Sequence, residues 1–572
     1  MSEVDHARLD RLRRGHGPVG EHVIDEFVAG RLSRRQFLSR ATKVGLGLPV
    51  AAAIVAACGR NASKTSNSSA TGPSSSSGSA KAGKPGGTIR AGMVVPAGAI
   101  NPLTINDTGG LEVLDQVGES LVHIDHNLVY HPLLATSWST NPDGSVWTFK
   151  IRQNAKFNDG TPMTVDDVVY TFKSQANPKL GVNAASIFGG TLSPAGVVKK
   201  DSETIEFHLE APDGGFVDAC SQDNYNTTIV PDNFDFTKFQ QTMPGTGKFK
   251  MTSYSPTVGA AFVKNPYYWG APAKPDKLEV TFFASEAPMT AALEAGTIMC
   301  NDGFSVAVSP QLLSGGFDLV AAKAAQHREL SMRCDIGPFA DARVRRAMAL
   351  TLNRPQIVHA LFKGYATIGN DSPFAPIYPA TNHSVPQRHQ DIAQARQLMA
   401  QAGKSRGFAV TLASEQLEEM PEYATIIKAA AAHINIDITL SVTTSSIYYG
   451  AGVFGKSPWL DATMSLVDYG GRGVPNIYLE APLQTIDNAT GQGAWNAAHF
   501  NNATYDRLSK QFIAASDLST QRRLAGEIET LLLDETPIIY AYFYDVLLAQ
   551  KGVTGVDLTQ QGNIYYYDAT LT

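Results

Sequence analysis

Residues 59–87 contain no large apolar side chain, and this feature decides where the chain can begin to fold. The segment holds nine serines, and most of the rest is Gly, Ala, Asn, Thr, Pro and Lys. Such a composition buries too little surface to offset the entropy lost on ordering, so residues 58–87 are predicted to be a flexible tether. A segment of this length has a root-mean-square reach of roughly 30 Å. The folded part is therefore expected to begin near Thr88.

The whole chain has enough apolar material for several large cores. At about 150 residues per domain, 572 residues correspond to roughly three to four domain-sized units. Hydrophobic residues make up 43% and charged residues 17%, which excludes a disordered or fibrous chain. The net charge of −6 gives no basic surface for nucleic acid.

The first 57 residues are predicted to be an export signal. Residues 33–38 read Ser-Arg-Arg-Gln-Phe-Leu, which is typical of twin-arginine signals. Residues 44–57 carry no charge, but they are too few for a membrane span, which needs about 20 apolar residues. They lead into Val-Ala-Ala-Cys at 55–58, which resembles a bacterial lipobox. We expect cleavage before Cys58 and a diacylglycerol on its thiol, on the outer face of a bacterial cytoplasmic membrane. A cleavable signal with an incidental cysteine, or a short buried helix, is the alternative.

Beyond Thr88 the chain alternates short apolar strands with amphipathic helices, which predicts an α/β fold. Strands are expected at 146–151 and 278–283, and a helix at 164–172 begins at a Thr cap. Further helices are expected at 342–361, 393–402 and 505–533. No second linker like 59–87 occurs, so the domains are expected to be interleaved through short crossings.

The sequence offers little catalytic chemistry. Zinc-protease, nucleophile-elbow and phosphate-loop motifs are absent, and Gly245-Thr246-Gly247 lacks the rest of a dinucleotide fingerprint. His123 and His126 have a spacing seen in some metal sites, but no other ligand completes a set. The remaining cysteines are expected to be buried thiols, or one disulfide and a free thiol: Cys220, Cys300 and Cys334. We therefore predict no enzyme activity, no cofactor and no metal.

A series of short strings follows one order along residues 88–560. The strings lie at 133–138, 143–152, 156–162, 166–169, 245–249, 265–269, 293–298, 343–348, 353–354, 364–366, 500–502 and 535–537. In order and spacing they resemble family 5 of the extracytoplasmic solute-binding proteins, which serves peptide and nickel ABC importers. Their aromatic and arginine residues are interpreted as fold markers, and a fold alone does not give the ligand.

The resemblance implies an α/β, two-lobed periplasmic-binding-protein fold of the peptide-binding type, with an extra domain inserted in the first lobe. By analogy the first lobe covers 88–284 with the insert at about 125–240, and the second lobe covers 285–540. Residues 541–572 return to the first lobe. Ligand would be trapped between the lobes by closure about a hinge. A monomer is expected.

The resemblance also points to ligand-binding residues. In the family, an Asp within a conserved string binds the α-ammonium of a peptide, and residues 465–475 match that string with Asp468 at the anchoring position. Tyr469 follows it and is included with the ligand-binding residues. Arg472 could pair with a ligand carboxylate, or with Asp468 in a structural ion pair. Trp495 could line the cleft, or have a core or loop role.

The leading hypothesis is a lipid-anchored protein that captures short peptides and delivers them to an ABC permease. Within that class, an oligosaccharide or a nickel chelate is the alternative solute. From a different class, the alternative is a surface enzyme or a regulatory envelope lipoprotein on the same scaffold. The missing catalytic motifs argue against the enzyme.

Overall fold

The computed structural model describes residues 83–572, except 451 and 489–490. The predicted export signal, the lipidated Cys58 and residues 58–82 of the predicted tether lie outside the described residues. Within the described part of the chain, no helix is both long and apolar enough to cross a membrane.

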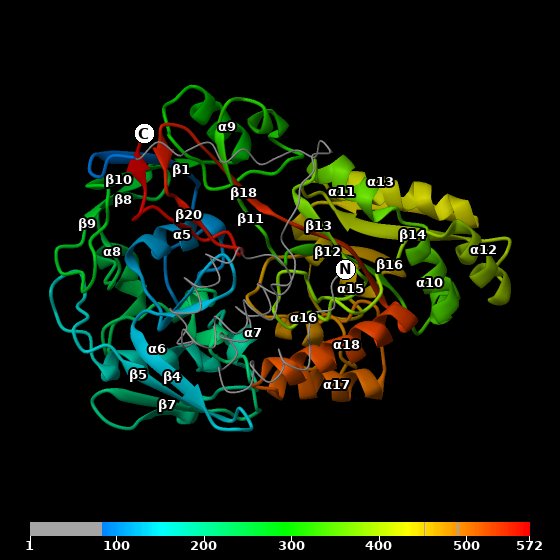
Figure 1. Ribbon diagram of the computed structural model, residues 1–572, viewed down its shortest axis with the longest axis horizontal. Helices are drawn as coiled ribbons and strands as arrows, with labels where there is room; N and C mark the ends of the chain where they lie inside the picture. Colours follow the sequence, from blue (N-terminus) through cyan, green and yellow to red (C-terminus); the bar gives the residue numbers. More distant parts are fainter. Residues whose placement is uncertain (1–82, 451, 489–490) are drawn as a thin grey trace, which may run out of the picture. The chain divides into compact units, whose positions relative to one another are not determined.

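Four strands form the N-terminal sheet, of which one is drawn in blue and three in green in Figure 1. In spatial order they are β1 (Thr88–Val94), β10 (Lys277–Phe283), β9 (Gly259–Lys264) and β8 (Phe249–Ser255). β1 and β10 are parallel although almost 190 residues separate them. Leu278, Val280 and Phe282 alternate inward along β10, which confirms the predicted strand. Helix α5 (Thr108–Val117) packs its apolar side into the same core.

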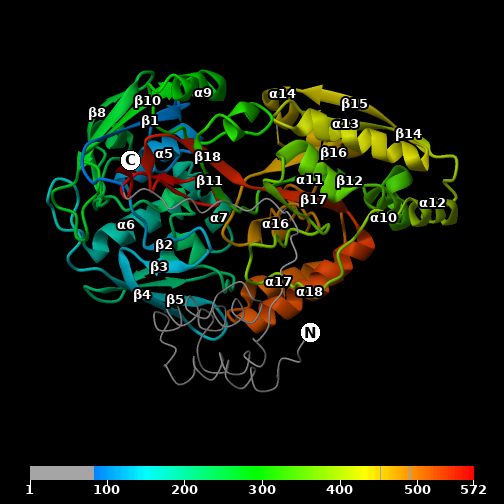
Figure 2. The same ribbon diagram turned by 45° about the horizontal axis from the view of Figure 1, so that its top comes forward.

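A second, antiparallel sheet, called here the insert sheet, forms between β1 and β8. Its order is β4 (Ala135–Thr140), β5 (Val146–Ile151), β7 (Thr204–His208) and β6 (Val197–Lys199). Helix α6 (Val165–Gln175) covers it, as Figure 2 shows. The Phe172 ring lies 4.8 Å from that of Phe207, which in turn lies 5.5 Å from that of Phe149. These edge-to-face contacts fix the helix on the sheet.

The C-terminal sheet has six strands. Their order is β13 (Ala366–Ile368), β17 (Ile538–Tyr544), β12 (His327–Met332), β16 (Met464–Tyr469), β14 (Phe408–Glu415) and β15 (Ile436–Thr443). β12 is antiparallel to both of its neighbours, and β14 is parallel to both of its own.

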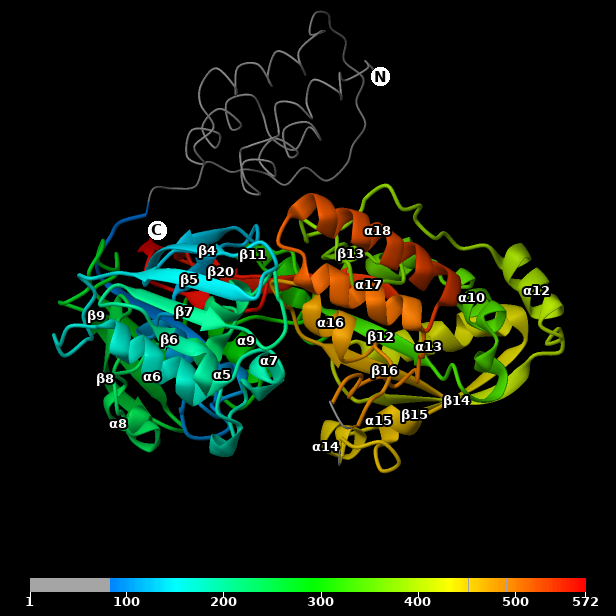
Figure 3. The ribbon, with the colours of Figure 1, turned by 90° about the horizontal axis from the view of Figure 1, so that it is seen from below.

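Helices cover both faces of this sheet. One face packs against α10 (Ala342–Leu350), α11 (Arg354–Phe362), α12 (Ile392–Gln401) and α13 (Met420–Ala431). The other packs against α17 (Ala503–Ala514) and α18 (Leu518–Glu535), which lie together in Figure 3. Leu466 belongs to the first core and Val467 to the second, because successive strand residues point to opposite faces.

Two antiparallel strands lead the chain into the C-terminal sheet and out of it. β11 (Asp318–Ala322) comes shortly before β12, and β18 (Val546–Gln550) directly follows β17. After β18 the chain returns to the N-terminal core, where Ile564 and Tyr566 are buried. The predicted lobe bounds and the predicted hinge stay predictions.

Two of the predicted helices are each a pair of helices. The helix expected at 342–361 ends at Leu350 and restarts at Arg354, where Asn353 accepts a hydrogen bond from the Gln356 N–H and Pro355 occupies the first turn. The helix expected at 505–533 is interrupted before α18, whose cap Asp517 accepts from the Thr520 N–H. In both cases an Asn or Asp side chain accepts a hydrogen bond from a free backbone N–H group of the first turn, and this cap stabilises the start of a second helix.

The remaining helices and strands are short. They are β2 (Val122–Ile124), β3 (Tyr130–Pro132), α7 (Ala185–Phe188), α8 (Phe239–Thr242), α9 (Glu286–Glu294), α14 (Ser445–Tyr449), α15 (Pro458–Asp461), α16 (Asn476–Glu480), β19 (Val553–Thr554), β20 (Asp557–Leu558), β21 (Ile564–Tyr565) and β22 (Thr570–Leu571). Among the described residues Cys220, Cys300 and Cys334 are free thiols, so the alternative with a disulfide is wrong; Cys220 and Cys300 are buried as expected, whereas Cys334 is half-buried.

Candidate ligand-binding site

Asp468 lies near the end of strand β16, directly opposite Arg328 of the neighbouring strand β12. Side chains opposed on adjacent antiparallel strands lie about 5 Å apart at their Cβ atoms. The Asp468 carboxylate therefore reaches the Arg328 guanidinium and forms an ion pair with it. Beyond Tyr469 the chain leaves the sheet in a loop, 470–475, that leads to α16.

Arg328 is the centre of a larger group, called here the Arg328 cluster, formed with Asp468, Glu418 and Glu419. The Arg328 side chain is only 1% exposed. Its Nη2 atom lies 3.0 Å from Glu418 Oε2, and its Nε atom lies 3.0 Å from Glu419 Oε1. Its Nη1 atom also donates to the Tyr544 hydroxyl. One guanidinium is thus shared by three carboxylates.

The Arg328 cluster has an excess of negative charge. With every group ionised, three carboxylates and one guanidinium leave two negative charges uncompensated. Asp468 and Glu418 are 30% and 36% exposed, so the excess can be reached from solvent. Burial raises the pKa of Glu418 to about 7, against the lowering effect of Arg328. Glu418 also has a left-handed backbone, with φ of 41°, at the point where its carboxylate joins the cluster. A ligand cation would compensate the remaining negative charge of the Arg328 cluster.

Tyr469 lies in the core rather than on the loop. Its ring stacks on His327 with centroids 5.6 Å apart, and it lies 6.1 Å from the ring of Trp495. Burial raises its pKa well above the ordinary tyrosine value. Tyr469 therefore points into the core, on the face of β16 opposite to Asp468, and its ring lies beside that of Trp495.

Arg472 does not pair with Asp468 in the described structure, because Arg328 takes that place. Its Nη1 atom donates to the Gly471 carbonyl at 2.7 Å, and its own carbonyl accepts from the Tyr378 hydroxyl at 2.9 Å. Its side chain faces Asp218 and Asp223, whose carboxylates are within its electrostatic influence. The structural alternative for Arg472 thus has different partners from those the sequence suggested.

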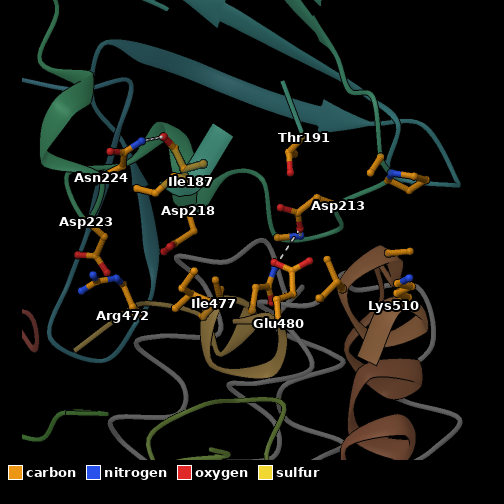
Figure 4. Close-up of a pocket in the computed structure, with 18 of the residues that line it drawn as sticks. Ile187, Thr191, Asp213, Asp218, Asp223, Asn224, Arg472, Ile477, Glu480 and Lys510 are labelled. Carbon is orange, nitrogen blue, oxygen red and sulfur yellow. Dashed lines mark hydrogen bonds between the residues drawn. The ribbon is translucent and has the colours of Figure 1, made fainter. Parts of the chain in front are cut away.

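Arg472 and Trp495 line a pocket of about 350 Å³ between the insert segment 187–224 and residues 472–514. Figure 4 shows Asp213, Asp218 and Asp223 on one side and Arg472, Ile477 and Glu480 on the other. We call it the acidic pocket, because four carboxylates line it: Asp213, Asp218, Asp223 and Glu480.

The pocket carboxylates are held where ionisation is costly. Burial raises the pKa of Asp213 to about 6 and the pKa values of Asp218 and Glu480 to about 7. Burial and then the nearby Asp218 raise the pKa of Asp223 well above its usual range. Near neutral pH these carboxyls are therefore a mixture of protonated and ionised forms, and a cation would favour the ionised forms.

Residues that sequence reasoning missed make up most of both groups. Arg328 lies in the strand His327–Met332, in which three successive residues are titratable although every residue is buried. Such a strand signals a buried polar network. The acidic pairs around 218–223 and 418–419 fit no motif, so only the fold brings them together. No group of three or more His, Cys, Asp or Glu suited to a metal ion occurs in the described ranges.

Comparisons with known proteins agree with this architecture. Residues 129–476 match the model of the bacterial extracellular solute-binding proteins, family 5. The dipeptide-binding protein DppE of Bacillus subtilis is 26% identical over 477 residues, which cover 77% of this chain and 84% of DppE.

Two solved structures show the same fold. The DppA protein of Helicobacter pylori, in complex with the peptide STSA, superposes with a TM-score of 0.68 at 20% identity, over 85% of this chain and 98% of DppA. The NikZ protein of Campylobacter jejuni, in complex with Ni(L-His), superposes with a TM-score of 0.67 at 19% identity, over 84% of this chain and 99% of NikZ. These likenesses confirm the predicted α/β, two-lobed binding-protein fold. Because the family model matches more than half of the chain, this protein belongs to family 5 of the bacterial extracellular solute-binding proteins.

Proposed function

We propose that this protein is the lipid-anchored substrate-binding component of an ABC importer that captures short peptides and delivers them to the permease. The observation that supports this proposal best is the negative excess of the Arg328 cluster at a reachable strand end. The α-ammonium of a peptide is a cation with three hydrogen-bond donors, which suits carboxylates held in place but not neutralised.

Peptides are favoured over other solutes by the names of the relatives and by the charge of the site. DppE is named for dipeptides, and the DppA structure contains a peptide. A sugar would use aromatic platforms, whereas the reachable groups of the Arg328 cluster are carboxylates. Binding is proposed to close the lobes over the peptide, so that affinity and closure are one linked equilibrium. We propose no reaction for this site.

Anchoring belongs to the same proposal. A lipid on Cys58 and a tether of roughly 30 Å would keep the binding body close to its permease on the outer face of the membrane. Twin-arginine export would deliver the body there already folded.

Native mass spectrometry of the full chain, purified from membranes in detergent, tests the ligand class. We expect a ladder of masses that matches mixed short peptides. A single non-peptide mass would keep the fold and the binding role but replace the substrate.

The variant Asp468→Asn tests the anchor. It should weaken binding of a short peptide by roughly 2–5 kcal/mol, which is about 30- to 5,000-fold. The fold should be kept, because Glu418 and Glu419 still hold Arg328. The matched control is Asp437→Asn, an exposed carboxylate on β15 of the same sheet. Unchanged peptide affinity of Asp468→Asn in calorimetry would show that Asp468 is not the anchor.

A further inference from the structure

We propose that the acidic pocket is a subsite for a cationic side chain, so that the protein prefers short peptides that contain lysine or arginine. This inference rests on the proposed function, because it assumes that the ligand is a peptide.

The walls of the pocket match both parts of such a side chain. Apolar residues provide contact for a methylene stem: Ile187, Val474, Ile477, Trp495 and Ile513. The carboxylates of the acidic pocket provide acceptors for its charged end. Lysine and arginine combine an apolar stem with a cationic head in this way. A volume of about 350 Å³ is within the roughly 300–1,000 Å³ typical of small-molecule sites, so one side chain fits with room for solvent.

Two buried acceptors in the pocket have no donor. Asp223 Oδ1 and Asn224 Oδ1 make no hydrogen bond among the described residues, although Asp223 is 4% exposed and Asn224 is 2% exposed. A buried acceptor left without a donor is unfavourable, because it has lost its hydrogen bonds to water. A group that brings several N–H donors, such as an ammonium or a guanidinium, would satisfy them.

The resident cations leave the carboxylates available. Within the described part of the chain, no ion pair within 4 Å joins Arg472 or Lys510 to a carboxylate of the acidic pocket. The bonds that hold these carboxylates come from neutral donors: Tyr130 donates to Asp218 at 3.0 Å, and Gln560 donates to Asp223 at 3.0 Å. Four carboxylates thus face two cations that do not neutralise them directly.

The pocket is lined by the chain segment that follows the proposed anchor. Arg472 follows Asp468 by four residues along the loop that leaves β16. Trp495, in the pocket wall, lies beside Tyr469, the residue next to Asp468. Asp468 and Tyr469 point to opposite faces of β16, so a peptide held by its ammonium at Asp468 would pass the end of this strand to place a side chain in the acidic pocket.

The backbone of loop 470–475 packs directly against the carboxylates of Asp218 and Asp223. A methyl group at Gly473 would lie 2.1 Å from Asp218 Oδ1 and 2.6 Å from Asp223 Oδ2. Because glycine has no side chain, both carboxylates can contact the loop at this position, where they can face a ligand group beside Arg472.

The test is calorimetry of the full chain in detergent with matched tripeptides. Lysine, norleucine or glutamate is placed in turn at each position of an otherwise alanine tripeptide. Norleucine keeps the apolar stem and removes the charge. At one position we expect lysine to bind about tenfold or more tighter than norleucine, and glutamate to bind weakest.

Two variants locate the effect. Asp223→Asn and Asp218→Asn should each reduce the preference for lysine over norleucine to less than about threefold. Asp437→Asn should keep the full preference. Thermal unfolding of both variants checks the fold, and two different positions keep the test valid if one of them unfolds.

The outcomes separate the two proposals. Equal affinity for lysine and norleucine peptides at every position overturns the cationic subsite and leaves peptide binding in place. A lysine preference that survives both variants also overturns it. Failure of every tripeptide to bind overturns the proposed function, and the subsite with it.

Discussion

Replacing Arg328 by methionine should destabilise the protein in a way that depends on pH. Arg328 is buried and shared by Asp468, Glu418 and Glu419, so its loss leaves three carboxylates without a cation. Breaking a buried ion pair by removing one partner costs about 3–5 kcal/mol. Methionine has a similar reach, so little of this loss would come from a cavity. At about pH 7 we expect the free energy of unfolding to fall by about that amount.

Acidification should restore part of the loss. Without Arg328 the pKa values of the carboxyls in the folded state rise above their unfolded values, so the folded state binds more protons than the unfolded state. The free energy of unfolding then increases as pH falls, by up to about 1.4 kcal/mol per pH unit for each carboxyl that takes up a proton. Near pH 5 the deficit relative to the native protein should therefore shrink to about 1–3 kcal/mol, the cost of buried polar groups that are neutral but incompletely bonded.

Urea denaturation followed by tryptophan fluorescence, near pH 7 and near pH 5, measures both quantities. The matched control is Arg343→Met, because the ion pair of Arg343 with Asp341 is at the surface. That variant should shift the midpoint little at either pH. An equal deficit of Arg328→Met at both pH values, or no deficit, would refute the account of the Arg328 cluster as a guanidinium that compensates buried carboxylates.

Three further predictions follow from the site and the anchor. Gly473→Ala should weaken binding of the lysine tripeptide, because its methyl group would displace Asp218 and Asp223; calorimetry would show this, and unchanged binding would mean that the loop does not set the pocket. Affinity for the lysine tripeptide should rise with pH through about 7 more steeply than affinity for the norleucine tripeptide in the same titration, since Asp218 and Glu480 have pKa values of about 7, whereas Glu418 of the anchor affects both tripeptides alike. Cys58→Ser should move the protein from the membrane fraction to the soluble fraction on immunoblots, and a protein still bound to the membrane would exclude the lipid as its anchor.

The sequence predicted correctly those helices and strands whose bounds are determined by neighbouring residues. The strand at 146–151 has the bounds of β5, because period-two alternation shows directly which residues face the core. The helix after Thr164 begins where expected, and Asp167 accepts from the Thr164 N–H at 2.6 Å. The prediction of one continuous helix was wrong at two places, and the reason is also local. The predicted ranges 342–361 and 505–533 place Asn353 and Asp517 inside a helix, although both residue types prefer the N-cap position.

The candidate site depends on residues that are distant in the chain, so only part of it could be predicted from the sequence. Asp468 was found through the family resemblance, but its partner Arg328 lies 140 residues away and Glu418 lies 90 residues from that arginine. No pattern in one segment can report which charged residues a folded sheet brings together. The same holds for Asp218 and Asp223, which line one pocket with Arg472 although about 250 residues of chain separate them from it.

The two acidic groups differ in a way that suits two tasks. The Arg328 cluster has a buried guanidinium among its carboxylates, which compensates part of their charge directly and leaves a negative excess for an ammonium. The acidic pocket has no such direct ion pair among the described residues, and burial raises the pKa values of its carboxyls. Its carboxyls are partly protonated near neutral pH, and they become more fully ionised when a cation enters. A binding protein built this way would accept many peptides through the first group and prefer cationic ones through the second.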